Sequence, residues 1–184
     1  ATTLVEIGPG KVLSGLARRI EPELSILNLE DPAGVAAAVT ALTEIGTPGA
    51  IAALETALND EDRDIRLVTI RALTARTHRP ALTKVDAIVK GKGARDADRT
   101  ERIAIFELYG TICGDAGVAF LDGLLSAKGG LFARKEDPEL RACAAIALGR
   151  IGSAGARTAL ERAVGEKDVI VRSAVARALR GGNA

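Results

Sequence analysis

The sequence predicts an all-α fold, a right-handed α-solenoid of helical hairpins that follows a short N-terminal β-α-β segment. Three observations lead to this prediction. A stretch of the chain recurs within its 184 residues; apolar residues make up 47% of the chain but aromatic residues only 2%; and no strand-like alternation follows residue 32. A core of Ala, Leu, Ile and Val suits closely packed helices better than a β-sandwich. The predicted domains are residues 1–32, an appendage or cap, and residues 33–184, the repeat domain.

The first 32 residues carry the only strand-like runs. Residues 3–7 and 25–29 are predicted strands, and residues 11–20 form an amphipathic helix between them. Such a unit would pair its two strands in parallel. The turn Gly8-Pro9-Gly10-Lys11 lacks the spacing of a phosphate-binding loop, so we expect a plain tight turn.

Residues 3–42 resemble the C-terminal segment of malonyl-CoA:acyl-carrier-protein transacylases, on the run V-E-I-G-P-G-K-V-L-S-G-L at residues 5–16. Three origins are open: a C-terminal piece of a larger fusion, a segment joined from another source, or a vestigial capping element. The nucleophile of that family sits in a Gly-x-Ser-x-Gly turn beside a His base. Here Ser153 lies in Ile-Gly-Ser-Ala-Gly and the single histidine, His78, lies in Thr-His-Arg-Pro. No catalytic residue is carried over, and the chain is expected not to be an enzyme.

The internal repeat is clearest when residues 46–73 are set against residues 152–179 without a gap. Twelve of these 28 positions are identical, among them Asp62 with Asp168 and Arg66 with Arg172. Partial copies lie around residues 98–125 and 137–148. A unit of about 30 to 36 residues is the length of a helical hairpin that stacks on its neighbours, and four to five such hairpins are expected.

Each repeat is predicted to contain two helices. One is opened by an Asp that caps the free N–H groups, as Asp62 does before the apolar positions of residues 65–73. The other is short and rich in Ala and Leu, at residues 48–58 and 154–164. Gly152 is expected to take the left-handed conformation that ends a helix, and Pro48 to lie in a first helical turn.

These features resemble HEAT-like repeats of the short bacterial type over about residues 33–182. The resemblance implies that each Asp caps a helix and that the Arg four residues later reaches neighbouring turns, so that successive repeats form a polar ladder. The ladder residues would be Asp62, Arg66, Asp98, Arg102, Asp137, Arg141, Asp168 and Arg172.

A stack of hairpins buries a shared core and leaves an extended surface that binds without a large ordering cost. We therefore expect a non-catalytic scaffold whose partner is another protein. The insertion at residues 126–136 carries a Gly-Gly pair and apolar residues between basic ones, and insertions in repeat proteins often lie at the binding edge. The candidate partner surface is Arg71, Glu107, Lys128, Leu131, Phe132, Arg134 and Lys135.

Two alternatives stay open: a transacylase fragment or fusion without its catalytic residues, and a helical repeat that binds nucleic acid. A net charge of +1 does not favour nucleic acid. No run of about 18 apolar residues is evident, so no membrane partner is expected. Cys113 and Cys143 lie on apolar helical faces and are expected to be buried free thiols of a cytoplasmic protein, without metal or cofactor. The oligomeric state does not follow from the sequence.

Overall fold

A computed structural model describes residues 3–6, 25–28, 38–39, 41–42, 44–45, 47–127 and 136–181. The chain forms two compact units, Ala1–Arg76 and Thr77–Ala184. The compact units thus divide inside the repeat region. The predicted domain boundary at residues 32 and 33 lies outside the described residues and stays a prediction. All described secondary structure after residue 38 is helical, as expected from the composition.

The described part of the first unit includes the strands β1 (Thr3–Glu6) and β2 (Ser25–Asn28), helical residues within 38–45, and the helices α3 (Pro48–Ala57) and α4 (Arg63–Ala75). The strands pair in parallel, with Thr3 opposite Ser25. The predicted helix at residues 11–20 lies outside the described residues, so the β-α-β segment stays a prediction. The bounds of α3 and α4 are close to the predicted ones.

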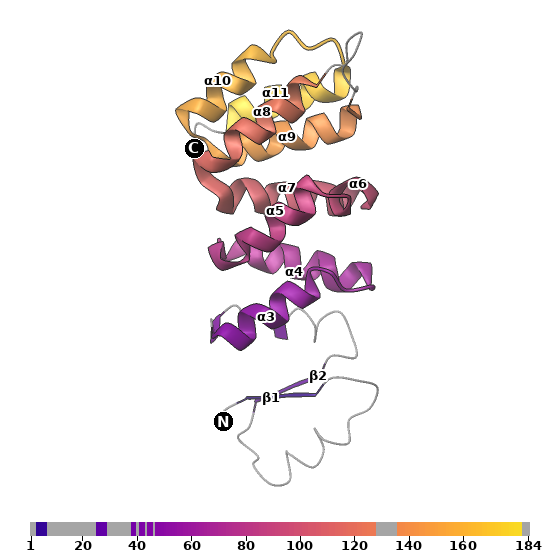
Figure 1. Ribbon diagram of the computed structural model, residues 1–184, viewed down its shortest axis with the longest axis vertical. Helices are drawn as coiled ribbons and strands as arrows, with labels where there is room; N and C mark the ends of the chain where they lie inside the picture. Colours follow the sequence, from indigo (N-terminus) through magenta and orange to yellow (C-terminus); the bar gives the residue numbers. More distant parts are fainter. Residues whose placement is uncertain are drawn as a thin grey trace. The chain divides into compact units, whose positions relative to one another are not determined.

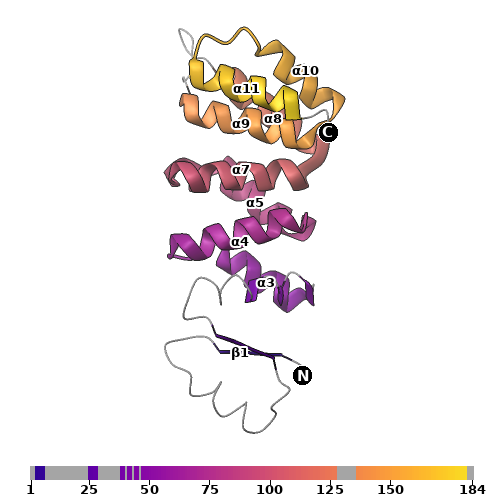
Figure 2. The same cartoon turned by 180° about the vertical axis from the view of Figure 1, so that it is seen from behind.

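The second unit is built from helices only, within its described residues 77–127 and 136–181. In chain order these are η1 (Arg79–Ala81), α5 (Leu82–Lys90), α6 (Gly93–Asp96), α7 (Arg99–Cys113), η2 (Gly114–Gly117), α8 (Val118–Ser126), α9 (Pro138–Ile151), α10 (Ala154–Arg162) and α11 (Val169–Gly181). Helix α9 packs against both α7 and α11, and these three lie side by side in one row (Figures 1 and 2). Helices α5, α8 and α10 form a second layer against that row.

Local signals start and stop these helices. The Asp62, Asp98 and Asp137 carboxylates accept hydrogen bonds from backbone N–H groups in the first turns of α4, α7 and α9. Asp168 does the same for Ile170 and Val171 of α11. The short helices are capped by hydroxyls: Thr47 Oγ1 accepts from the Ala50 N–H, and Ser153 Oγ from the Ala156 N–H, both at 3.3 Å.

The connection between α9 and α10 uses a glycine in the left-handed region. Gly152 has φ +66° and ψ 4°, and its N–H donates to the Leu148 carbonyl at 3.1 Å. This bond satisfies a carbonyl that the end of α9 would leave free. The left-handed helix end expected at Gly152 is therefore confirmed.

Two glycines let the helices of the row approach closely. An added Cβ at Gly110 of α7 would lie 2.4 Å from the Ala147 carbonyl oxygen of α9, and one at Gly149 of α9 would lie 2.8 Å from the Ala178 Cβ of α11. Each glycine stands twelve residues after the Asp that caps its helix. Each alanine that faces a glycine stands ten residues after the Asp that caps the alanine's helix. The same close contact is thus repeated from α7 to α9 and from α9 to α11.

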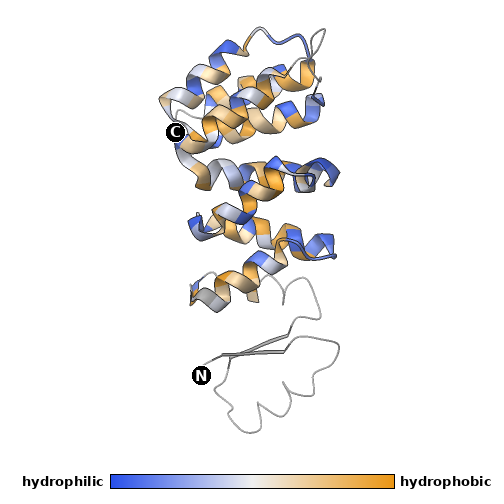
Figure 3. Ribbon diagram, viewed as in Figure 1, coloured by the Kyte–Doolittle hydropathy of each residue, from blue (hydrophilic) through white to orange (hydrophobic). Residues whose placement is uncertain are grey.

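The core of the second unit lies between the two helical layers. Its largest fully buried side chains include Phe106, Tyr109, Leu121 and Leu148. Hydrophilic residues gather instead at the α6–α7 turn (Figure 3). This division between an apolar interior and polar turns is what stacked amphipathic helices require.

One stretch differs from the sequence expectation about membranes. Arg99–Ser126 is long and apolar enough, by length and composition, to cross a membrane. In the structure it is α7, η2 and α8, interrupted at Gly114 with φ +57°. Half of its most apolar window is buried within the protein. Its apolar side chains therefore contribute to the core that α7 and α8 share with α9.

Candidate functional site

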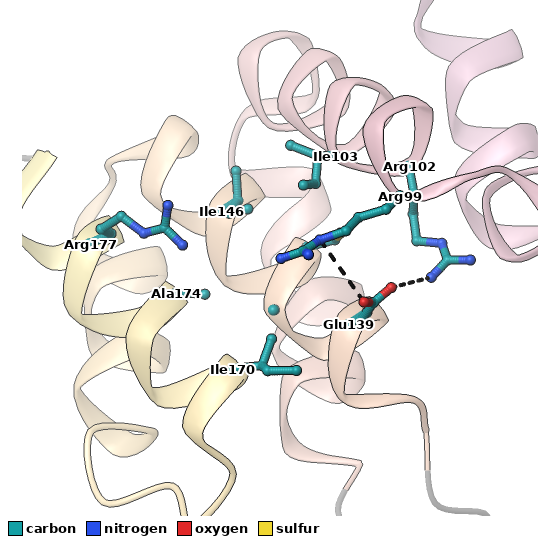
Figure 4. A pocket seen from close by; sticks show the side chains of 10 residues that line it. Arg99, Arg102, Ile103, Glu139, Ile146, Ile170, Ala174 and Arg177 are labelled. Carbon is teal, nitrogen blue, oxygen red and sulfur yellow. Dashed lines mark hydrogen bonds and ion pairs between the residues drawn. The ribbon is translucent and has the colours of Figure 1, made fainter. Parts of the chain in front are cut away.

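A hollow lies on the row of α7, α9 and α11, between their side chains (Figure 4). It holds about 390 Å³ of empty space, part of which is open solvent. Its floor consists of small buried side chains of α9 and α11: Ala142, Cys143 and Ala174. Ile103 and Ile146 are half-buried in its wall, and Ile170 is 44% exposed. The hollow is therefore an apolar depression on the surface of three successive helices.

Charged side chains surround this depression. The Arg99 Nε lies 4.0 Å from Glu139 Oε1, and the Arg102 Nη1 lies 3.4 Å from Glu139 Oε2. Arg177 lines the hollow from α11 and has no hydrogen-bond or ion-pair partner among the described residues. Figure 4 shows the guanidinium groups of Arg99 and Arg177 pointing toward one another from α7 and α11. Three arginines and one carboxylate give the lining an excess of positive charge.

The Asp caps set the positions of several lining residues. Because Asp98 fixes the start of α7, Arg99 and Arg102 fall in its first turn. Glu139 and Ile170 are each the second residue after the capping Asp of α9 and α11. The starts of the three helices thus supply part of the lining, and residues farther along α9 and α11, such as Ile146 and Arg177, supply the rest.

Two of the arginines that stand four residues after a capping Asp, Arg66 and Arg172, bind backbone carbonyls of connecting segments. Arg66 donates to the Asp60 and Glu61 carbonyls, and Arg172 to the Glu166 and Lys167 carbonyls. These bonds span 2.8–3.3 Å. Such carbonyls lie outside helices and need a donor. The arginines therefore hold the turns that lead into α4 and α11.

Arg102 extends this arrangement from one repeat to the next. It donates to the carbonyls of Ala94, Arg95 and Ala97 in the segment before α7, and its Nη1 also lies 3.4 Å from Asp137 Oδ2, the cap of α9. This contact joins the first turn of α7 to the cap of α9. The ladder of eight residues as a whole stays a prediction.

Arg141 uses a different acid. Its Nε donates to the Leu125 carbonyl at 2.9 Å, and its Nη2 pairs with Glu166, not with Asp168. The side chains are only 2% and 6% exposed. Glu166 also accepts from the Lys167 N–H through Oε1 at 2.8 Å. This buried pair therefore ties the α10–α11 turn to α9.

A second polar cluster joins α5, α7 and α8 away from the hollow. Asp86 Oδ1 accepts from Lys90 Nζ at 2.7 Å and from the Tyr109 hydroxyl at 2.9 Å. Lys90 stands 5.5 Å over the Phe120 ring, and that ring meets Tyr109 edge-on with 6.3 Å between centroids. Burial acts to raise the pKa of Asp86, but the hydrogen bonds from Lys90 and Tyr109 lower it below its ordinary value. Burial also raises the pKa of Tyr109. The cluster therefore links α5, α7 and α8 through hydrogen bonds and ring contacts.

The two thiols are buried and free. Burial raises the pKa of Cys113 to about 11 and that of Cys143 to about 12. Neither thiol would be an activated nucleophile at neutral pH, because the thiolate is the reactive form.

His78 lies at the start of η1, where its buried Nε2 has no hydrogen-bond partner among the described atoms. No cluster of three or more metal-binding side chains occurs in the described part of the chain.

Two of the seven predicted partner-surface residues, Arg71 and Glu107, lie among the described residues, one in each compact unit. Arg71 is exposed on α4. Glu107 of α7 accepts from Arg150 of α9 at 2.9 Å. The remaining five, Lys128, Leu131, Phe132, Arg134 and Lys135, lie outside the described residues and stay a prediction. Ala127 and Glu136 are the described residues on either side of these five. The Glu136 N–H donates a hydrogen bond to the Ala127 carbonyl at 3.1 Å.

Several residues of the hollow were not singled out from the sequence. They are Ile103, Glu139, Ile146, Ile170 and Arg177. Arg177 had a sequence signal, since it recurs at the same repeat position as Arg71. The isoleucines had none, because they occupy different positions in their repeats.

A comparison with models of protein families identifies the repeats. The family model described as HEAT repeats matches residues 20–108 and 130–180, which is more than half of the chain. No curated protein matches the chain significantly.

Proposed function

Because this chain belongs to the HEAT repeat family, we propose that it is a non-catalytic scaffold for protein–protein interaction. Proteins built from HEAT repeats commonly hold other proteins and are generally not enzymes. Their stacked hairpins supply an extended surface that is already ordered before a partner arrives. Within the proposal, the repeats of the chain stack as a right-handed α-solenoid.

The observation that carries this proposal is the hollow on α7, α9 and α11. An exposed apolar patch beside an arginine without an ion-pair partner among the described residues is typical of surfaces that bind other proteins. Ile170 keeps 44% of its surface in solvent, although it lies directly above the buried Ala174. The face of α7, α9 and α11 around the hollow, which we term the arginine face, is therefore the proposed contact surface.

The buried interactions support a static role for the rest of the second unit. The Arg141–Glu166 pair is tied to neighbouring backbone groups, and Gly110 and Gly149 hold the helices in close contact. A rigid row of helices presents its surface at little entropic cost to binding.

The transacylase alternative concerns residues 3–42, most of which lie outside the described residues, and it stays a prediction. An acyl-transfer assay with malonyl-CoA and acyl carrier protein separates it from the scaffold proposal. Turnover above a no-protein control would overturn the non-catalytic assignment.

The scaffold proposal predicts that selection from a random peptide display library on the purified full chain enriches peptides specific to the arginine face. Such peptides should lose most of their binding to a variant with Ile170→Ser and Arg177→Glu. Enrichment and affinity would be measured by sequencing and by fluorescence polarisation of the selected peptides.

A matched control carries the same changes away from the hollow, Val164→Ser and Arg180→Glu. Val164 is 53% exposed, and Arg180 lies in the last turn of α11. This variant should bind the selected peptides like the parent chain. If no peptide is enriched, or if both variants bind equally, the arginine face is not the contact surface.

A further inference from the structure

We propose that the arginine face binds an extended acidic peptide segment of a partner protein, with one aliphatic side chain inserted into the hollow between Arg99 and Arg177. This inference rests on the proposed function and specifies the chemistry of the partner.

The charge of the lining argues for an acidic partner. Glu139 is the single carboxylate among the lining residues, and it contacts both Arg99 and Arg102. Arg177 has no such contact among the described residues, and 71% of the Arg99 side chain is exposed. Two guanidinium groups on opposite sides of the hollow are thus accessible to carboxylates, with which they form charge-assisted bonds.

The floor argues for an aliphatic anchor. Cys143 and Ala174 are 3% and 1% exposed, and Ile103, Ile146 and Ile170 stand around them. An aliphatic side chain placed there would lose its contact with water and pack on three isoleucines. Small floor residues leave room for a side chain instead of filling the space themselves.

The dimensions argue for an extended segment. Packed helices lie about 8–10 Å apart, so crossing from α7 over α9 to α11 takes about 16–20 Å. An extended chain rises about 3.3 Å per residue, and about six residues span that distance. A central aliphatic residue would then sit over α9, with acidic neighbours near Arg99 and Arg177.

The same arginines favour a peptide over a nucleic acid. Single strands bind through aromatic residues that stack on bases. Among the described residues, Phe106 and Tyr109 are buried and Phe120 contacts Tyr109 and Lys90 instead. No aromatic side chain lines the hollow. The isoleucine side chains offer no hydrogen-bond donor or positive charge to a phosphodiester backbone.

The test is a methyl NMR titration of the full chain labelled at its isoleucine δ1 methyl groups. The probe is a nine-residue peptide with one Ile between two pairs of Glu in a Gly-Ser frame. It should shift the methyl signals of Ile103, Ile146 and Ile170, but not that of Ile88 on α5. Arg177→Glu should weaken binding by about tenfold or more, since it replaces an attraction by a repulsion. Arg180→Glu, on the same helix outside the hollow, should change the dissociation constant less than twofold.

Three results would overturn the inference. The first is that a peptide with Gln in place of Glu binds as tightly as the acidic peptide, which would show that the carboxylates do not contribute to binding. The second is an absence of shifts at the three methyl groups with any of these peptides. The third is that a thymidine oligonucleotide shifts these signals at physiological salt and the acidic peptide does not. Selected peptides that bind the arginine face without acidic residues would sink this inference and leave the scaffold proposal standing.

Discussion

Replacing Gly110 by Ala lowers the free energy of unfolding of the second unit by about 3 kcal/mol, the upper part of the range for overpacked cores. Ala in a helix is ordinarily more stable than Gly by up to about 1 kcal/mol. Here the new methyl group would meet Ala147 of α9 at 2.4 Å from the carbonyl oxygen and 2.8 Å from Cα. These are backbone atoms, so relief requires α7 and α9 to separate. The steric cost therefore exceeds the gain in helix propensity.

Urea denaturation followed by tyrosine fluorescence measures this effect directly, because Tyr109 is the single tyrosine of the chain and lies on α7. The matched control is Gly123→Ala on α8, where an added Cβ meets nothing within 4 Å. That change should leave stability equal or raise it by up to about 1 kcal/mol. Equal midpoints for Gly110→Ala and the parent chain would show that the α7–α9 contact is looser than described.

Replacing Arg141 by Met costs about 3–5 kcal/mol of stability, as expected when one partner of a buried ion pair is removed. Met retains an apolar stem of similar length, so packing is largely kept. The change removes the guanidinium that pairs with the buried Glu166 carboxylate and the donor to the Leu125 carbonyl. The loss is thus electrostatic, and it destabilises the α10–α11 turn and α9 together.

A double variant separates this cause from a loss of packing. Arg141→Met with Glu166→Leu should recover a large part of the lost stability, since no buried charge remains. Arg162→Met is the exposed control. Arg162 pairs with Asp122 at 2.7 Å but is 66% exposed, and such pairs contribute at most about 1 kcal/mol. A double variant no more stable than Arg141→Met alone would contradict the ion-pair explanation.

The fold was predictable where the signal is local. The helices expected at residues 48–58 and 154–164 are α3 and α10, one or two residues shorter at their C-terminal ends. Gly152 takes its conformation from neighbours within four residues. Capping bonds and left-handed ends depend on short sequence separations, so a single sequence carries them.

The buried pair and the close helix contacts were not predictable in the same way. Arg141 meets Glu166 across 25 residues, and the repeat equivalent of Glu166 is Asp60, so no identity marks the position. A glycine inside a helix signals a close approach, but not to which helix.

The hollow escaped prediction for a related reason. Ile103, Ile146 and Ile170 stand five, nine and two residues after their capping Asp. The side chains converge only because three successive helices pack side by side, and no periodic pattern along the chain marks them. The sequence favoured the insertion at residues 126–136 instead, because its Gly-Gly pair and its apolar residues between basic ones stand out in composition.

The most direct test of recognition by the arginine face is photo-crosslinking in the cells that make this protein. A photoreactive phenylalanine analogue would replace Ile170 in one strain and Val164 in another, since both side chains are exposed in the same repeat. We predict a discrete protein adduct at position 170, identified by mass spectrometry, and none at position 164. Adducts of equal yield at both positions, or an adduct at position 164 alone, would contradict the account.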